Sequence, residues 1–256
     1  MNYNYHTHTT RCGHASGTER EYIERAIANG IEYMGFSDHA TFVFPDGFES
    51  RYRVPLAKAP DYFATISALR EEYKDRIDIK IGFEMEYYPA YFDAMLKLVK
   101  ELGAEYLILG QHFIGNEHPG GRHTFRQDNS VENLKEYVDC VVAAIQSGVF
   151  TYVAHPDVLG FVADDALFKA EMRRICEASK TYGIPLEINF LGIREGRSYP
   201  NMLFWEVAGE VGCPVTFGFD AHEVAAAYDG ESLKVALEMV GKYGLNYVGR
   251  PEVRPL

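Results

Sequence analysis

Short apolar segments alternate with longer amphipathic segments along the whole chain, and this alternation limits the possible folds more than any other feature. Strands are predicted where β-branched and aromatic residues gather, at Asn2–His6, Ile31–Ser37, Ile77–Glu84, Tyr106–Gly110, Thr151–Ala154, Pro185–Phe190 and Pro214–Phe219. Helices are predicted between them, at Thr18–Ala28, Pro60–Lys74, Tyr91–Glu101, Val131–Gln146, Asp165–Tyr182, Met202–Val211 and Glu231–Tyr243. Strands that alternate with helices imply parallel pairing with right-handed crossovers.

Capping residues mark the ends of the predicted helices. Thr18 is suited to cap the first helix, and glycines stand where helices should stop, at positions 30, 103, 148, 183, 212 and 244. An open doubly wound sheet and a closed β/α barrel both fit this order of elements. No G-x-G-x-x-G motif follows the first strand, which weakens the dinucleotide-binding version of the open sheet. No linker or low-complexity segment interrupts residues 1–256, so we predict one domain.

The chain is acidic, with a formal net charge of −12, and this charge disfavours binding to a nucleic-acid backbone. No apolar run approaches the roughly 20 residues that span a bilayer, and the N-terminus does not resemble a secretory signal. The cysteines are widely spaced and form no C-x-x-C pair, so we expect them to be reduced and buried, as in a cytoplasmic protein. The oligomeric state is not predicted.

Two long segments break the alternation. Residues 41–59 (TFVFPDGFESRYRVPLAKA) and 113–129 (FIGNEHPGGRHTFRQDN) are rich in glycine, proline, charge and aromatic rings. Long loops in compact domains often form lids or binding loops, although a surface excursion fits equally well here. Arg122, His118 and His123 lie in the second loop, where contact with a substrate and simple solvation both stay open.

Histidines and carboxylates lie at the ends of six of the seven predicted strands. His6 and His8 form an H-T-H motif, and residues two apart on a strand point to the same side. The other candidate ligands at strand ends are His39, Glu84, His112, His155, Asp220 and His222. In a β/α barrel the carboxyl ends of the strands share one face, where active sites are built. The sequence therefore predicts a metal site on that face.

Two further residues lie close to these candidates. His14 follows the H-T-H motif in the loop TTRCGHASG and can fold over the same face, so we count it as a ninth candidate ligand. Cys12 lies two residues before it, but a packed thiol is favoured over a ligand.

The motifs HTHTTRCGHASGT, SDH, GFEMEY, GQHF, AHPD and GFDAH resemble, in this order, those of the polymerase-and-histidinol-phosphatase (PHP) family. The resemblance extends from His6 to His222 and is greatest to the histidinol-phosphate phosphatase branch, on the evidence of the CGHASGT loop and the stretch EINFLGIREGRSYP. It implies a distorted (β/α)7 barrel that holds three divalent ions. One departure is that Phe190 and Leu191 replace small polar residues expected after the asparagine.

The resemblance also implies a set of ligands for each ion. A first ion would be bound by His6, His8, Glu84 and Asp220. Glu84 would bridge to a second ion held by His112 and His155, and a third would be held by His14, His39 and His222.

Closely spaced divalent ions suit the hydrolysis of a phosphate ester, because water held between them loses a proton more readily and attacks phosphorus. A mostly imidazole ligand set favours zinc, iron or manganese over magnesium or calcium. Arg194 and Arg197 follow the sixth strand and are candidates to bind the phosphate, with a surface salt bridge as the alternative. Asp157 is a candidate to orient a ligand or transfer a proton.

These observations predict a phosphomonoesterase that acts on a small molecule, and L-histidinol phosphate is the best single substrate. Other substrates of a related phosphoesterase, such as a phosphotyrosyl protein, a nucleotide or a sugar phosphate, stay open. An amidohydrolase is less favoured, because that class bridges its ions with a carboxylated lysine on strand four, where this chain reads YLILGQH. A metal-binding module without catalysis is disfavoured, since structural zinc sites are closed four-ligand sites.

Overall fold

The main sheet contains eight strands that all run parallel, in the order β1-β2-β3-β4-β7-β8-β9-β10. The computed structural model describes all 256 residues. The strands of this sheet are β1 (Tyr3–Asn4), β2 (Tyr33–His39), β3 (Asp78–Met85), β4 (Tyr106–Leu109), β7 (Phe150–Val153), β8 (Leu186–Asn189), β9 (Pro214–Gly218) and β10 (Asn246–Tyr247). The predicted strand-helix alternation is therefore confirmed.

The sheet curls into a distorted barrel, as predicted. The chain beyond β1 meets the chain beyond β9 through a parallel bridge between Thr7 and Ala221. The amide of His8 donates to the carbonyl of Ala221 at 3.0 Å, and the amide of Ala221 donates to the carbonyl of His6 at 3.2 Å. These bonds bring the ligand candidates of the first and seventh predicted strands side by side. The short eighth strand, β10, was not predicted.

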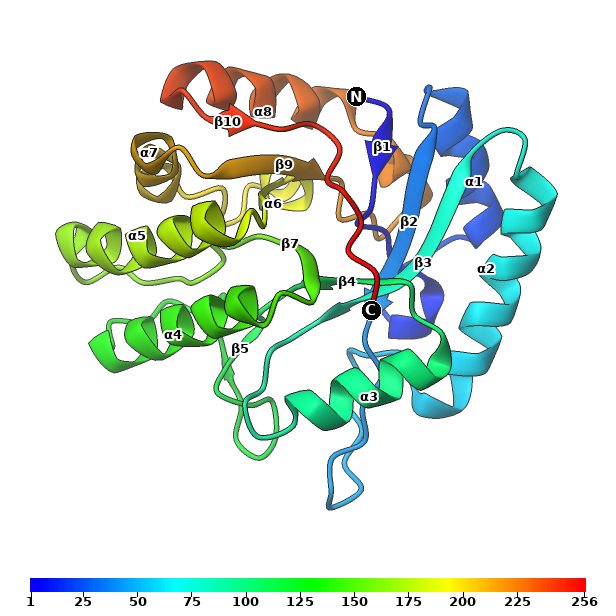
Figure 1. The fold of residues 1–256 in the computed structure, drawn as a ribbon, viewed down its shortest axis with the longest axis horizontal. Helices are drawn as coiled ribbons and strands as arrows, with labels where there is room; N and C mark the ends of the chain where they lie inside the picture. The colour runs from blue at the N-terminus through cyan, green and yellow to red at the C-terminus, as the bar shows by residue number, and fades with distance from the viewer.

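Helices surround the sheet (Figure 1). They are α1 (Glu19–Ala28), α2 (Ala59–Tyr73), α3 (Phe92–Leu102), α4 (Val131–Ser147), α5 (Asp165–Tyr182), α6 (Phe190–Glu195), α7 (Met202–Val211) and α8 (Gly230–Tyr243). Their apolar faces and the outside of the sheet form one large core, while Tyr3, Tyr5, Tyr106 and Tyr152 pack with Ile108 in a second cluster. None of these helices is long and apolar enough to cross a membrane.

The predicted helix ends agree with the structure. Thr18 caps α1 through a reciprocal capping box with Glu21. Glycines in the left-handed conformation end α3, α4, α5, α7 and α8, as predicted. Several predicted strand ends differ from the structure by one or two residues. The prediction for Phe190 was wrong, because this residue does not end a strand but begins α6, a helix that was not predicted. The side chain of Asn189 accepts a bond from the amide of Gly192 at 3.1 Å, and this cap starts the helix directly at the strand end. All four cysteines are free and buried, as predicted.

The C-terminal segment covers the end of the barrel opposite the ligand candidates, and it runs toward the centre of the view in Figure 1. The guanidinium of Arg254 donates to the carbonyls of Gly148 at 3.3 Å, Tyr182 at 2.9 Å and Gly183 at 3.4 Å. These carbonyls lie at the C-terminal ends of α4 and α5, where intrahelical donors have run out. Arg254 therefore ties two helix ends to the last residues of the chain.

Substitution of Arg254 by alanine is expected to lower the free energy of unfolding by about 1–2 kcal/mol, because three carbonyls lose a charged donor. For a chain of this size the melting temperature should fall by roughly 2–8 °C. Thermal unfolding followed by circular dichroism measures the change. Arg25→Ala is the matched control, since Arg25 is exposed on α1 and its side chain makes no hydrogen bond. Equal melting temperatures for the two variants would contradict the capping role of Arg254.

Candidate metal centre

The nine predicted ligands gather at the C-terminal ends of the strands. Four of the three-residue groups whose ligand atoms lie within 4.8 Å of one another consist of predicted ligands alone: His6 with His8 and Glu84, His6 with His155 and Asp220, His39 with Glu84 and His112, and His14 with His39 and His222. A fifth group adds Cys12 to His8 and His222. Every predicted ligand belongs to at least one group, and the groups share members. The structure therefore forms one continuous cluster from residues that are as much as 216 positions apart, from His6 to His222.

Glu84 lies at the centre of the cluster, with one oxygen toward each side. Its Oε1 atom lies 2.9 Å from Nε2 of His155 and 3.4 Å from Nε2 of His112. Its Oε2 atom lies 3.1 Å from Nδ1 of His39 and 3.6 Å from Nε2 of both His6 and His8. A carboxylate whose two oxygens face two different sets of imidazole rings in this way is suited to bridge two ions.

Gly110 makes room for this carboxylate. A Cβ atom at position 110 would lie 1.9 Å from Oε1 of Glu84, which is far inside van der Waals contact. Position 110, which precedes Gln111 and His112 after β4, is therefore restricted to glycine for a steric reason, because any larger residue there would displace Glu84.

Buried ligand atoms without a partner mark the first position for a cation. Nε2 of His6, Nε2 of His8 and Oδ1 of Asp220 are buried and have no hydrogen-bond partner in the protein. Nε2 of His6 lies 3.5 Å, and Nε2 of His8 3.2 Å, from that oxygen. Buried polar atoms are seldom left without partners, so these three lone-pair carriers fit a bound metal ion.

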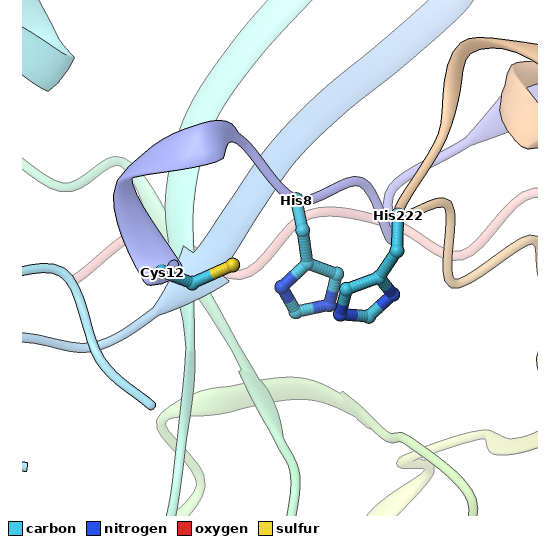
Figure 2. A group of neighbouring side chains, drawn as sticks. All are labelled: His8, Cys12 and His222. Carbon is cyan, nitrogen blue, oxygen red and sulfur yellow. The ribbon is translucent and has the colours of Figure 1, made fainter. Parts of the chain in front are cut away.

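A second set of imidazoles forms the outer side of the cluster. The rings of His8 and His222 stack at 3.9 Å, and Figure 2 shows them side by side with the sulfur of Cys12 directed toward His8. The exposed His14 lies 4.9 Å from His222 and 5.2 Å from His39, measured between ring centroids. The thiol of Cys12 is buried and donates to the carbonyl of Thr9 at 3.1 Å, which fits the predicted packing role.

The electrostatics of the cluster favour ionised carboxylates and a neutral outer set of histidines. Burial opposes ionisation of Glu84 and Asp220, but the surrounding histidines hold the pKa of each carboxyl well below its usual value. Burial and the neighbouring histidines lower the pKa values of His14, His39 and His222. These three imidazoles are therefore neutral near pH 7 and have lone pairs to offer.

Two of the candidate ligands have a strained backbone. His155 has φ of 30° and Asp220 has φ of 47°, in the left-handed region that non-glycine residues rarely adopt. Such strain costs of order 1–3 kcal/mol and persists only where the surrounding structure enforces it. In both cases the strained residue lies two positions after the end of a strand, β7 for His155 and β9 for Asp220, and its side chain is part of the cluster.

A cavity of about 530 Å³ opens over the cluster. The two long loops form one side of it, through Ser50, Tyr52 and Arg53 from residues 41–59 and Phe113, Glu117, His123, Phe125 and Arg126 from residues 113–129. The loops are joined by a hydrogen bond of 2.7 Å between Asp46 and His118 and by the stacked rings of Phe48 and His118. The two loops therefore pack against each other beside the cavity. His123 lines the cavity, while His118 joins the two loops.

Of the three residues predicted to bind phosphate or transfer a proton, only Arg197 lines the cavity. Arg197 lines the cavity, whereas Arg194 does not, because its guanidinium donates to Asp229 at 2.9 Å and to the carbonyl of Asp220 at 3.3 Å. Asp157 is buried away from the cavity, accepts a bond from the indole of Trp205 at 2.9 Å, and has its pKa raised by burial to about 6. The roles predicted for Arg194 and Asp157 stay untested, and the geometry favours Arg197 for contact with a substrate.

Four charged residues of the site were missed by the sequence analysis. Arg53 is buried at the cavity wall and pairs with Glu86 at 2.7 Å, and Glu86 accepts from Nδ1 of His112 at 2.9 Å. Arg126 lines the cavity, and Glu187 contacts His6. Glu187 lies on β8 and Glu86 directly follows β3, each among mostly apolar neighbours in the sequence, and this is the signal that could have revealed them. The arginines lie in loops without periodicity and gave no such signal.

The family is settled by a match to known proteins. The model of the PHP domain matches residues 4–190, well over half of the chain. The chain belongs to the PHP domain family. Curated relatives of this PHP protein are the probable histidinol-phosphatase of Deinococcus radiodurans, 27% identical with 85% of each chain covered, and the histidinol-phosphatase of Lactococcus lactis, 27% identical with 94% of this chain and 91% of the relative covered. The predicted family is therefore confirmed.

Solved structures support the fold of the PHP protein. It is similar to the crystal structure of histidinol phosphate phosphatase from Lactococcus lactis complexed with zinc, L-histidinol and phosphate, with a TM-score of 0.73 and 24% identity over 96% of this chain and 95% of that chain. Metal-dependent tyrosine phosphatases from Bacillus subtilis and Streptococcus pneumoniae are more distant, with a TM-score of 0.53 and 13% identity over 99% of each chain.

Proposed function

We propose that the protein is a metal-dependent phosphatase that hydrolyses L-histidinol phosphate to L-histidinol and phosphate. The first three curated relatives carry the name histidinol-phosphatase or probable histidinol-phosphatase, and the chain covers 85% or more of each of them. The proposal rests on one observation: a chain similar to histidinol-phosphatases has a continuous cluster of nine candidate metal ligands beneath a cavity.

The donor set fits three divalent ions. His6, His8, Glu84 and Asp220 would hold one ion, and Glu84, His112 and His155 a second. His14, His39 and His222 would hold a third at the mouth of the cluster. Seven imidazoles and two carboxylates suit zinc, iron or manganese better than magnesium, and the similar Lactococcus structure contains zinc.

Such ions activate a water molecule and neutralise the charge of a phosphate ester. Side chains of the protein would bind the phosphate and the organic part of the substrate. Arg53, Arg126 and Arg197 line the cavity and offer guanidinium groups to a phosphate. Aromatic side chains of Tyr52 and Phe125 form an apolar wall for the organic part of a small ester. Of the two residues that depart from the family pattern, Leu191 lines the cavity while Phe190 is buried in the core, so Leu191 is the one that shapes the pocket.

The proposed substrate is tested by comparing three phosphate esters on one enzyme preparation: L-histidinol phosphate, p-nitrophenyl phosphate and a phosphotyrosyl peptide. Histidinol phosphate should have by far the highest kcat/KM, because contacts beyond the phosphate add to transition-state binding. Addition of a chelator should stop hydrolysis of all three. A preference for the peptide would keep the phosphatase and discard histidinol phosphate, and activity in the chelator would discard the metal mechanism.

Replacement of Arg197 by alanine is expected to raise KM and to lower kcat/KM by about ten- to a hundredfold, the range for loss of a charged hydrogen bond worth about 1.5–3 kcal/mol. The guanidinium also bonds to Tyr199 at 3.0 Å and to Glu195 at 2.8 Å, so it is held at the cavity wall. Steady-state kinetics with histidinol phosphate measure the change.

Arg194→Ala is the matched comparison for this prediction. Arg194 supports the backbone of Asp220 from outside the cavity, so its loss should lower kcat and metal content while KM changes little. A rise in KM in the Arg194 variant, with normal kinetics in the Arg197 variant, would reverse the two assignments.

A further inference from the structure

A carboxylate outside the cavity contacts two of the proposed metal ligands. Glu187 lies on β8 and is fully buried. Its Oε1 atom is 2.8 Å from Nδ1 of His6, and its Oε2 atom accepts from the backbone amide of His155 at 3.1 Å and from the side-chain amide of Asn189 at 2.8 Å. His6 belongs to the proposed first ion and His155 to the second, so one side chain contacts both ligand sets.

The neighbouring strand leaves space for this carboxylate. Gly218 lies on β9, and a Cβ atom there would be 1.7 Å from Oε1 of Glu187. The position thus repeats the relation between Gly110 and Glu84 on the other side of the barrel. Gly110, directly after β4, and Gly218, at the end of β9, thus each make room for one buried carboxylate.

We propose that Glu187 is a positioning residue: it fixes His6 in the form that has its proton on Nδ1, and it holds the strained backbone of His155. An ionised carboxylate can only accept hydrogen bonds, so the proton between it and His6 must be on Nδ1. Nε2 then carries the free lone pair, and it points to Glu84 at 3.6 Å and to Asp220 at 3.5 Å without a hydrogen-bond partner.

The second contact acts on the backbone. The φ angle of His155 is 30°, and the bond from its amide to Oε2 of Glu187 is one of the contacts that hold this conformation. The side chain of Asn189 extends the network, because it donates both to Glu187 and, at 3.0 Å, to Oδ2 of Asp220. Asp220 is the other strained ligand. Glu187 therefore connects the geometry of the two proposed ion sites.

Two substitutions separate the two contacts. In Glu187→Gln the atom that faces the amides of His155 and Asn189 must still accept, so the amide oxygen takes that place and the NH2 group faces His6. His6 must then accept at Nδ1, carry its proton on Nε2, and lose the lone pair that faces the ion. In Glu187→Ala both contacts disappear.

Zinc affinity and the nitrogen spectrum of His6 test the proposal. Competition with a chromophoric chelator should show one zinc ion bound about 10- to 100-fold more weakly in Glu187→Gln and two ions weakened in Glu187→Ala, the range for loss of an outer-shell partner. In zinc-loaded, 15N-histidine-labelled wild type, His6 should carry its proton on Nδ1 and bind zinc through Nε2, and Glu187→Gln should lose this zinc-bound signal. The spectrum of His6→Asn assigns the signal.

Glu105→Gln is the matched control, because Glu105 also accepts from a backbone amide, that of Ile81 at 2.8 Å, but lies away from the cluster. Unchanged zinc affinity in Glu187→Gln, or a His6 bound through Nδ1 in the wild type, would overturn the proposal; the wild-type measurement decides even if a variant fails to fold. The inference rests on the proposed metal sites. Failure of wild type to bind zinc would reject those sites, whereas normal binding by both Glu187 variants would reject only the role of Glu187.

Discussion

Substitution of Glu84 by glutamine is expected to lower kcat by about a thousandfold or more, equivalent to about 4 kcal/mol in activation free energy, and to reduce the metal content of the purified protein. The two oxygens of Glu84 face different imidazoles, His39 at 3.1 Å on one side and His155 at 2.9 Å on the other. A glutamine keeps the volume but offers one acceptor and one NH2 group, so it cannot bridge two ions. Steady-state kinetics and elemental analysis on the same sample measure the two effects.

Glu105→Gln again supplies the control, because it changes a carboxylate that bonds to Arg70 and to the amide of Ile81 but not to the cluster. Its activity and metal content should match those of the wild type. Glu84→Gln with full metal content and only a few-fold lower kcat would show that Glu84 does not bridge ions, and the assignment of the GFEMEY segment would then have to be revised.

Removal of bound metal is expected to abolish hydrolysis and to lower the melting temperature by roughly 10 °C. Metal at about a thousand times its Kd stabilises the folded state by about 4 kcal/mol, and each kcal/mol corresponds to about 2–4 °C for a chain of this size. Activity and thermal unfolding are measured before chelation, after chelation, and after return of zinc, manganese or magnesium. Zinc or manganese should restore both properties, and magnesium should not. Full activity after chelation, with less than one ion per chain, would contradict the metal centre.

The difference in melting temperature between the metal-bound and the metal-free protein should also depend on pH. Burial alone would lower the pKa of His6, but the carboxylates of Asp220, Glu187 and Glu84 outweigh it and raise that pKa to about 10 in the metal-free protein. Stability from the proton on His6 is therefore complete below the ordinary pKa of about 6.5 and is lost as the pH rises through about 10. Metal must displace this proton, so its affinity rises over the same interval. The difference in melting temperature between the zinc-bound and the metal-free protein should therefore increase from pH 6.5 toward pH 9. A difference that decreases over this interval would contradict the linkage.

The position of most candidate ligands was predictable because they follow the carboxyl ends of strands, and the fold determines where those ends lie. Parallel strands place their carboxyl ends on one face, so His6, Asp220 and their counterparts could be placed together once the alternation of strands and helices was read. Glycines such as Gly183 at helix ends could be predicted because the left-handed conformation favours residues without a side chain. Phe190 was misplaced because the cap by Asn189 starts a helix within an apolar run, where strand and helix patterns look alike.

The sequence by itself determined the parallel β/α architecture, the identity of the nine candidate ligands and the phosphatase family, since each depends on local pattern or on residue type at strand ends. Only the tertiary structure decided that Arg197 rather than Arg194 faces the cavity, that Arg53 and Arg126 line it, and that Glu187 contacts His6 across the barrel. These facts depend on side-chain direction and on contacts between distant strands. Periodicity along the chain gives the face of a strand, but not which charged neighbour lies within 3 Å across the barrel.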